Sequence, residues 1–207
     1  MIKSKEEYVY YLKCDQLALN QKTNKPRFKH DIIWSFERLL RKCEYYQNYK
    51  TGCANKIICK YYKYRYTCLS QKLGFSIPFN VFGPGLSIAH YGPIIINARA
   101  KIGENCRIHE GVTIGVSGDS YWPHLQGLSL EQTKAPTIGN NVFIATGAKI
   151  LGDITIADDV TIGANAIVVN NILEPNITVG GIPAKQISLN SSDKYVIKAT
   201  ELIKDNG

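Results

Sequence analysis

Residues 137–168 read TIGNNVFIATGAKILGDITIADDVTIGANAIV and repeat one six-residue pattern. A period of six is neither the 3.6 residues of an amphipathic helix nor the two of an alternating strand. Fixed self-similarity of this kind indicates a solenoid, in which each repeat buries its apolar residues by stacking on its neighbours. The branched apolar positions are Ile138, Ile144, Ile150, Ile156, Ile162 and Val168, and four residues after each comes Val142, Ala148, Ile154, Val160, Ala166 or Ile172.

The repeat extends upstream and stops near Gly74. The same register runs from Ile96 to Ile114 and is interrupted before Ile138. Before Gly74, apolar residues recur at helical spacing instead. We therefore predict a helical N-terminal domain at 1–74, a β-solenoid domain at 75–188 with an excursion loop at 116–137, and a short C-terminal helical tail at 189–207. The helical positions are Ile33, Phe36, Leu39 and Leu40, then Ile57, Ile58, Tyr61, Tyr62 and Tyr66, and Asp31 is a candidate cap for the first of these runs.

The bulk composition is that of an ordinary globular protein. The chain has 207 residues, of which 44% are hydrophobic and 20% charged. It has no apolar run of 18 residues, and its first residues lack the apolar core of a secretory signal, so we expect neither a membrane span nor a secretory leader. The six cysteines form no Cys-x-x-Cys pair, which favours reduced thiols and a cytoplasmic location.

The net charge of +8 is concentrated near the N-terminus. Residues 1–74 hold 16 basic and 6 acidic residues, and residues 75–207 hold 9 basic and 11 acidic ones. The stretch 61–66 alternates bases with tyrosines, but no nucleic-acid motif accompanies it, so we predict no nucleic-acid partner. We expect a solvated helix face with tyrosines packed inside, and keep peripheral association with an anionic membrane as the alternative.

The solenoid resembles the hexapeptide-repeat acyltransferases over about residues 77–187. It looks closest to the serine acetyltransferase group and its relatives in surface-polysaccharide gene sets. The resemblance implies a mainly β fold, a left-handed parallel β-helix, with acetyl-CoA as cosubstrate and a homotrimer with active sites between subunits. The stretches that carry it are Leu86-Ser87-Ile88-Ala89-His90-Tyr91-Gly92, Val112-Thr113-Ile114-Gly115, Gly147-Ala148-Lys149-Ile150-Leu151-Gly152 and Val179-Gly180-Gly181-Ile182-Pro183-Ala184-Lys185.

Acetyl transfer to an alcohol needs a base that accepts the hydroxyl proton, and histidine suits this role near neutral pH. His90 falls in the register of Ile96 and Ile102, a slot that elsewhere points inward, so either the coil is distorted there or the histidine is functional. The resemblance matches His90 to the family's catalytic base. His109 follows an inward Ile108, so it points outward about one coil above His90, and is the second catalytic candidate.

The resemblance also places the cosubstrate and the acceptor. By match to the family, the acetyl-CoA arm lies along the coil surface, against small residues. Lysines near that surface could meet the CoA phosphates. Either Asn80 or a backbone carbonyl is expected to orient His90. The candidate cosubstrate residues are Gly115, Val116, Thr146, Ala164, Lys149 and Lys185, and the candidate acceptor-site residues are Asn80, Tyr91, Tyr121, Trp122 and His124.

Several positions depart from the serine acetyltransferase pattern. The family's two site aspartates are matched by Phe75 and Ala89, and its Arg-His-Pro by Lys134-Ala135-Pro136. These losses predict a sugar hydroxyl as acceptor, in surface-polysaccharide synthesis, with L-serine as the alternative. The chain ends Lys204-Asp205-Asn206-Gly207 rather than in isoleucine, so we expect no cysteine synthase complex.

Two other classes fit the solenoid less well. Hydratases that resemble γ-class carbonic anhydrases need a zinc ion on three histidines, two of them at i and i+5, and this spacing is absent, so we expect no metal. A non-catalytic trimeric scaffold remains an alternative. His90 beside Gly92, with the Gly-Gly-Ile-Pro-Ala-Lys ending, argues for an enzyme.

Overall fold

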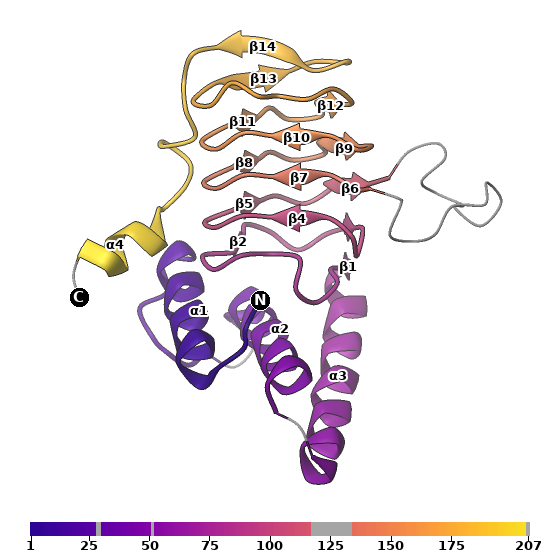
Figure 1. The fold of residues 1–207 in the computed structure, drawn as a ribbon, viewed down its shortest axis with the longest axis vertical. Coiled ribbons are helices and arrows are strands. Elements are labelled where there is room, and N and C mark those ends of the chain that lie inside the picture. Colours follow the sequence, from indigo (N-terminus) through magenta and orange to yellow (C-terminus); the bar gives the residue numbers. More distant parts are fainter. Residues whose placement is uncertain (28–29, 51, 117–133, 206–207) are drawn as a thin grey trace, which may run out of the picture.

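The fold is a column of stacked coils that stands on three helices (Figure 1). The computed structural model describes residues 1–27, 30–50, 52–116 and 134–205. In Figure 1 the C-terminal segment runs down beside the column and ends near α1, and α1 and α4 are in contact. The helices are α1 (Lys5–Ala18), α2 (Ile32–Asn48), α3 (Cys53–Leu73) and α4 (Ala199–Asp205).

The strands of the column form three sheets whose neighbours pair in parallel, apart from the antiparallel pair β13–β14. This arrangement is the predicted parallel β-helix with helices before it. One sheet has the order β1 (Phe75–Ser76), β3 (Ile94–Ile96), β6 (Thr113–Gly115), β9 (Lys149–Leu151) and β12 (Ile167–Val168); the second has β10 (Thr155–Ile156), β7 (Thr137–Ile138) and β4 (Lys101–Ile102); the third has β14 (Lys185–Ser188), β13 (Thr178–Gly180), β11 (Thr161–Ile162), β8 (Phe143–Ile144), β5 (Arg107–Ile108) and β2 (Ser87–Ile88).

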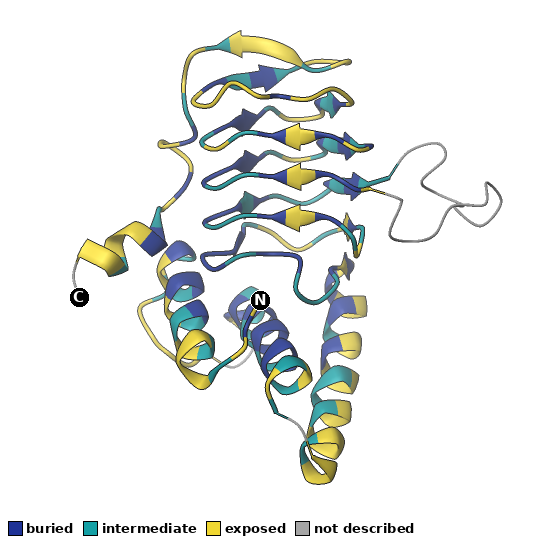
Figure 2. Ribbon diagram, in the orientation of Figure 1, coloured by how far each residue is buried: buried dark blue, intermediate teal, exposed yellow. Residues whose placement is uncertain are grey.

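The six-residue pattern fills the inside of the column. Ile144, Ile150 and Ile162 are completely buried, and the small partners Ala148 and Ala166 are as well. Figure 2 shows exposed residues on β4, β7 and β10, each of which has one exposed and one buried residue. Burial of branched apolar side chains stabilises the column by roughly 25 cal/mol for each Å² removed from water. The coil core therefore forms as the period predicts.

The first coil departs from this regularity. Ile96 pairs with Ile114, eighteen residues on, but Ile88 pairs with Ile108, twenty residues on. The two extra residues lie at the corner between β2 and β3. Ile88 therefore takes the inward slot, and His90, two residues later, is exposed. The coil is therefore distorted at this point, as one of the two alternatives from the sequence allowed, and the enlarged corner takes His90 out of the inward slot.

Helix α2 packs its apolar side against the column. Phe36 and Leu40 are fully buried in the same apolar cluster as Phe75 and Ile88. Asp31 stands at the start of α2, but its carboxylate accepts hydrogen bonds from Arg27 and does not cap the helix.

Helix α3 is more exposed than the sequence predicts. Tyr66 is buried against Phe36, but Ile57 is 71% exposed, Tyr61 55% and Tyr64 70%. The expectation that the tyrosines pack inside was therefore wrong for Tyr61 and Tyr64, because only the last turns of α3 reach the column. Within the described ranges, no helix has the length and apolar character needed to cross a membrane.

Candidate active site

One corner of the column brings together several of the predicted site residues. Strands β2, β5, β8 and β11 pair in register through Ile88, Ile108, Ile144 and Ile162. Residues two positions after these isoleucines therefore stack above one another at the corner that leads to the next sheet. These residues are His90, Glu110, Thr146 and Ala164.

His90, His109 and Glu110 form a cluster at this corner. The imidazole rings of His90 and His109 have centroids 5.5 Å apart and stand edge to face. One ligand atom from each of the three residues lies within 4.8 Å of the others. The His109 ring also stacks edge-on against Phe143, with centroids 5.2 Å apart. The sequence predicted the two histidines together, and the structure adds a carboxylate.

Glu110 is held in place by the coil above it. Its Oε1 accepts a hydrogen bond of 3.1 Å from the Thr146 hydroxyl, and its Oε2 is buried with no hydrogen-bond partner among the described residues. A Cβ added at Gly92 would lie 2.9 Å from the Glu110 Cβ. Since Gly92 also has a φ of 140°, which L side chains rarely adopt, this corner needs glycine there.

The surroundings of this corner lower the pKa of two of its groups, His109 and Glu110. Burial lowers the pKa of His109, and the nearby Arg107 lowers it further, while Glu110 opposes the shift. The pKa of Glu110 is lowered by a backbone hydrogen bond, by Thr146 and by the two imidazoles. The fold therefore favours a neutral His109 beside an ionised carboxylate. Two imidazoles and a carboxylate are also metal donors, and one oxygen of the carboxylate already accepts the Thr146 hydroxyl.

The predicted cosubstrate residues lie at different heights of the column. Thr146 and Ala164 are exposed directly above Glu110. Gly115 and Val116 are half-buried at the end of β6, and Lys149 in β9 donates to the Gly111 carbonyl. Lys185 is exposed in the last strand, β14, far along the coil stack from His90.

The acceptor candidates divide into three groups. Tyr91, next to His90, is 71% exposed and borders the cluster. Asn80 instead lies at a different corner, where its side chain bonds Asn48 at 2.6 Å, so it does not orient His90. Tyr121, Trp122 and His124 lie outside the described residues.

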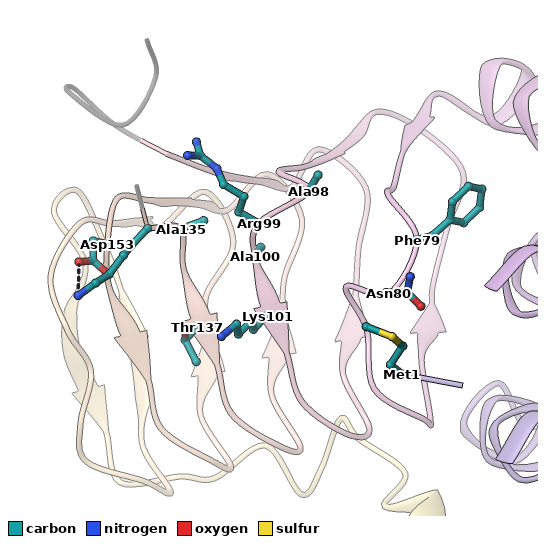
Figure 3. Close-up of a pocket in the computed structure, with 11 residues that line it drawn as sticks. Met1, Phe79, Asn80, Ala98, Arg99, Ala100, Lys101, Ala135, Thr137 and Asp153 are labelled. Carbon is teal, nitrogen blue, oxygen red and sulfur yellow. Dashed lines mark ion pairs between the residues drawn. The ribbon is translucent and has the colours of Figure 1, made fainter. Parts of the chain in front are cut away.

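Asn80 lines a pocket on another part of the column (Figure 3). Figure 3 shows Arg99 and Lys101 on the same lining. Lys134 also lines the pocket and forms an ion pair with Asp153 at 3.4 Å. His90, His109 and Glu110 are not part of it. The pocket and the histidine cluster are therefore separate features.

Sequence reasoning did not place Glu110 beside His90. The signal was present, because Glu110 lies twenty residues after His90 and the repeat brings successive coils together. It was missed because a strict eighteen-residue coil puts Ile108, not Glu110, above His90. The two-residue enlargement of the first corner brings Glu110 into register.

Comparisons with known proteins agree with this architecture. Residues 135–170 match the family model "Bacterial transferase hexapeptide (six repeats)". The chain is 41% identical to a serine acetyltransferase of Staphylococcus xylosus over 49% of this chain and 42% of that protein. It is 38% identical to one of Helicobacter pylori strain J99 over 51% of this chain and 56% of that protein. The chain thus spans about half the length of the curated relatives it matches.

A solved structure extends the likeness to the helices. The crystal structure of serine acetyltransferase from Brucella abortus strain S19 in complex with coenzyme A superposes with a TM-score of 0.64 at 23% identity, covering 90% of this chain and 70% of that one. At this identity the match concerns the fold. Together with the sequence matches, it confirms the predicted resemblance to the hexapeptide-repeat acyltransferases and their serine acetyltransferase group.

Proposed function

We propose that this chain is an acetyl-CoA-dependent O-acetyltransferase that acts on a small hydroxyl acceptor, with L-serine as the first candidate. The observation that carries the proposal is the cluster of His90, His109 and Glu110 on an exposed corner of the column. The named relatives support it, and one of them was solved with coenzyme A.

The cluster suits direct transfer within a complex of donor and acceptor. His90 takes the proton of the acceptor hydroxyl as its oxygen attacks the thioester carbonyl of acetyl-CoA. Backbone N–H groups of the coil stabilise the resulting oxyanion. The intermediate then collapses to the ester, and the departing CoA thiolate takes the proton back from His90. Glu110 stabilises the imidazolium while it carries that proton, because a nearby carboxylate favours the charged form.

Serine has more support than the sugar acceptor that the sequence predicts, since the curated relatives are named serine acetyltransferases. Glu110 also offers a carboxylate for the serine ammonium group, which Phe75 and Ala89 cannot. Phe75 is only 5% exposed, within the core. The same two positions favour a neutral sugar hydroxyl as the second candidate, with the aromatic ring of Tyr91 exposed beside His90.

Thiol release from acetyl-CoA, measured with L-serine and with a panel of nucleotide sugars and oligosaccharides, tests both acceptors. We expect serine turnover with a kcat/KM of at least about 10⁴ M⁻¹s⁻¹, the lower end of the usual enzyme range. Turnover with a sugar and none with serine would reverse the order of the candidates. No turnover with either, together with no CoA binding, would leave the scaffold alternative.

We further propose that the coils are left-handed and that three chains assemble around them, as the resemblance implies. Ile95 on β3 is 51% exposed, which leaves an apolar side chain on the flank next to the histidine cluster. A partner that covers this flank would also enclose His90. Light scattering at micromolar concentration should give three times the chain mass, and a stable monomer would contradict the assembly.

Two expectations about location complete the proposal. The unpaired cysteines favour the cytoplasm. Helix α3 exposes Lys56 and Lys60 beside Ile57 and Tyr61, which favours contact with an anionic membrane. Flotation with phosphatidylserine vesicles, at low and at high salt, would detect it. Equal recovery with neutral vesicles would contradict it.

A further inference from the structure

The strand that leads to His90 lies at the edge of its sheet. β2 pairs with β5 on one side and is the last strand in the sheet order. An edge strand leaves backbone N–H groups without strand partners, and burying such a group unpaired destabilises a fold. This edge faces the helices below the column (Figure 1).

Carboxylates from the helices take the place of the missing strand. Asp15 of α1 accepts hydrogen bonds from the amides of Gly85 at 2.8 Å and Leu86 at 2.9 Å. Glu37 of α2 accepts one from the amide of Ile88 at 2.9 Å. Both carboxylates are completely buried. The edge of the first coil is therefore satisfied by side chains of the helical region.

Among the described residues, Glu37 forms no ion pair, unlike the buried carboxylates near it. Arg41 pairs with Asp15 at 2.7 Å and with Glu44 at 3.1 Å. Burial raises the pKa of Glu37 well above its usual range, and the charge of Asp15 adds to the shift. Among the described residues, its Oε2 has no hydrogen-bond partner. The bond to Ile88 is thus the polar contact that Glu37 makes with the column.

The corner that bears His90 is anchored on both sides. Before it, the amide of Ala89 bonds the carbonyl of Ile108 at 3.0 Å, and the amide of Ile88 bonds Glu37. After it, the amide of Gly92 bonds the carbonyl of Leu73, the last residue of α3, at 3.0 Å. Two of these three anchors come from the helical region.

We propose that Glu37 is a positioning residue for His90, acting through the Ile88 amide. The inference rests on the proposed function for its kinetic consequence, but not for its structural one. Loss of the bond frees the start of the enlarged corner, so His90 samples positions away from Glu110 and from the acceptor. Misplacement by about 1 Å can cost a catalytic step roughly 100-fold.

Glu44 provides a matched control. It lies on the same helix, is 1% exposed and also accepts a backbone hydrogen bond, from the amide of Asn80 at 2.7 Å. That amide belongs to a different corner, away from His90. Glu44 additionally pairs with Arg41, so its loss should destabilise the fold at least as much as the loss of Glu37. A general effect of instability would therefore appear in both variants.

The first experiment needs no activity. Hydrogen–deuterium exchange is compared in the wild type, Glu37→Met and Glu44→Met, at a temperature where all three are folded by circular dichroism. We expect exchange in a peptide that covers 86–92 to rise at least about tenfold in Glu37→Met, and not in Glu44→Met. Unchanged exchange in Glu37→Met, or an equal rise in both, would overturn the inference.

The second experiment measures acetyl transfer with the acceptor that the wild type uses. We expect Glu37→Met to lower kcat about tenfold while the KM for acetyl-CoA stays within about twofold. Glu37→Gln keeps an acceptor oxygen for Ile88 and should restore the wild-type kcat. Glu44→Met should leave kcat unchanged. A wild-type kcat in Glu37→Met, or the same fall in Glu44→Met, would contradict the positioning role.

Two outcomes are separated by this design. If Glu37→Met does not fold, Glu37→Asp replaces it in both experiments, since its shorter side chain withdraws the oxygen from Ile88 and keeps the carboxyl group. If the wild type shows no transfer with any acceptor, the proposed function fails. The exchange measurement then still decides whether Glu37 holds the His90 corner.

Discussion

The first coil and the coils above it are built from the same hexapeptide chemistry but are held in different ways. Above β5 in the same sheet, β8, β11 and β13 each have a strand neighbour on both sides, and Ile144 and Ile162 pair in register. In the first coil, β2 has one strand neighbour, and on its other side the amide of Ile88 donates to Glu37 of α2. Asp15 of α1 accepts hydrogen bonds from the two residues just before β2.

This difference in support coincides with a difference between the regular coils and the coil that carries His90. The regular coils repeat one packing solution, so their corners carry small residues such as Ala164. The first coil has an enlarged corner, and its extra residues expose His90 and align it with Glu110. The candidate base thus lies where the repeat is least regular.

Removal of the His90 imidazole should have the largest effect. His90→Ala is expected to lower kcat for acetyl transfer by roughly 10²- to 10⁴-fold, the usual contribution of a general base, with little change in CoA affinity. His109→Ala should do less and mainly raise the KM of the acceptor. His30→Ala, in an exposed position before α2, is the control. Normal turnover in His90→Ala with a dead His109→Ala would exchange the two roles.

Removal of Arg41 tests how much the contacts between the helices and the first coil contribute to stability, compared with the packing of the regular coils. Arg41 is completely buried and joins Asp15 and Glu44, while it also donates to the carbonyls of Phe82 and Gly83. Arg41→Met leaves two buried carboxylates without their cation, and should lower the free energy of unfolding by about 3–5 kcal/mol.

The matched change in the column is Ile150→Val, which should cost about 0.5–1.5 kcal/mol, because one methylene leaves a packed core. Urea denaturation of both variants gives the comparison. Equal losses of unfolding free energy would mean that the buried Arg41 contributes no more to stability than one methylene of the coil core.

The pH dependence at His109 should be the smallest effect. Its pKa is lowered by burial below the ordinary value of 6.5, so the folded chain binds this proton less readily than the unfolded chain. Its contribution to stability is therefore present above pH 6.5 and is lost as the pH falls below it. Between about pH 7.5 and 5.5, Tm should fall slightly more in the wild type than in His109→Gln. An equal fall would show that His109 is not the group responsible.

The sequence predicted the coils well because their information is local. Each hexapeptide contains its own inward-facing residue, and Ile138, Ile150 and Ile162 need only a neighbouring repeat to be buried. The closeness of His90 and His109 followed from coil length and strand spacing. The burial of α3 did not follow, since the spacing of Tyr61 and Tyr64 cannot say how far a helix extends beyond its support.

By itself the sequence determined that this chain forms a parallel solenoid with helices in front of it, because a six-residue period can be buried in no other regular way. Only the tertiary structure decided what surrounds His90. The length of one corner brings Glu110 rather than Ile108 above the imidazole, and Glu37, fifty-one residues before Ile88 in the chain, meets the strand that carries it. Such contacts depend on how separate elements pack, and no local pattern encodes them.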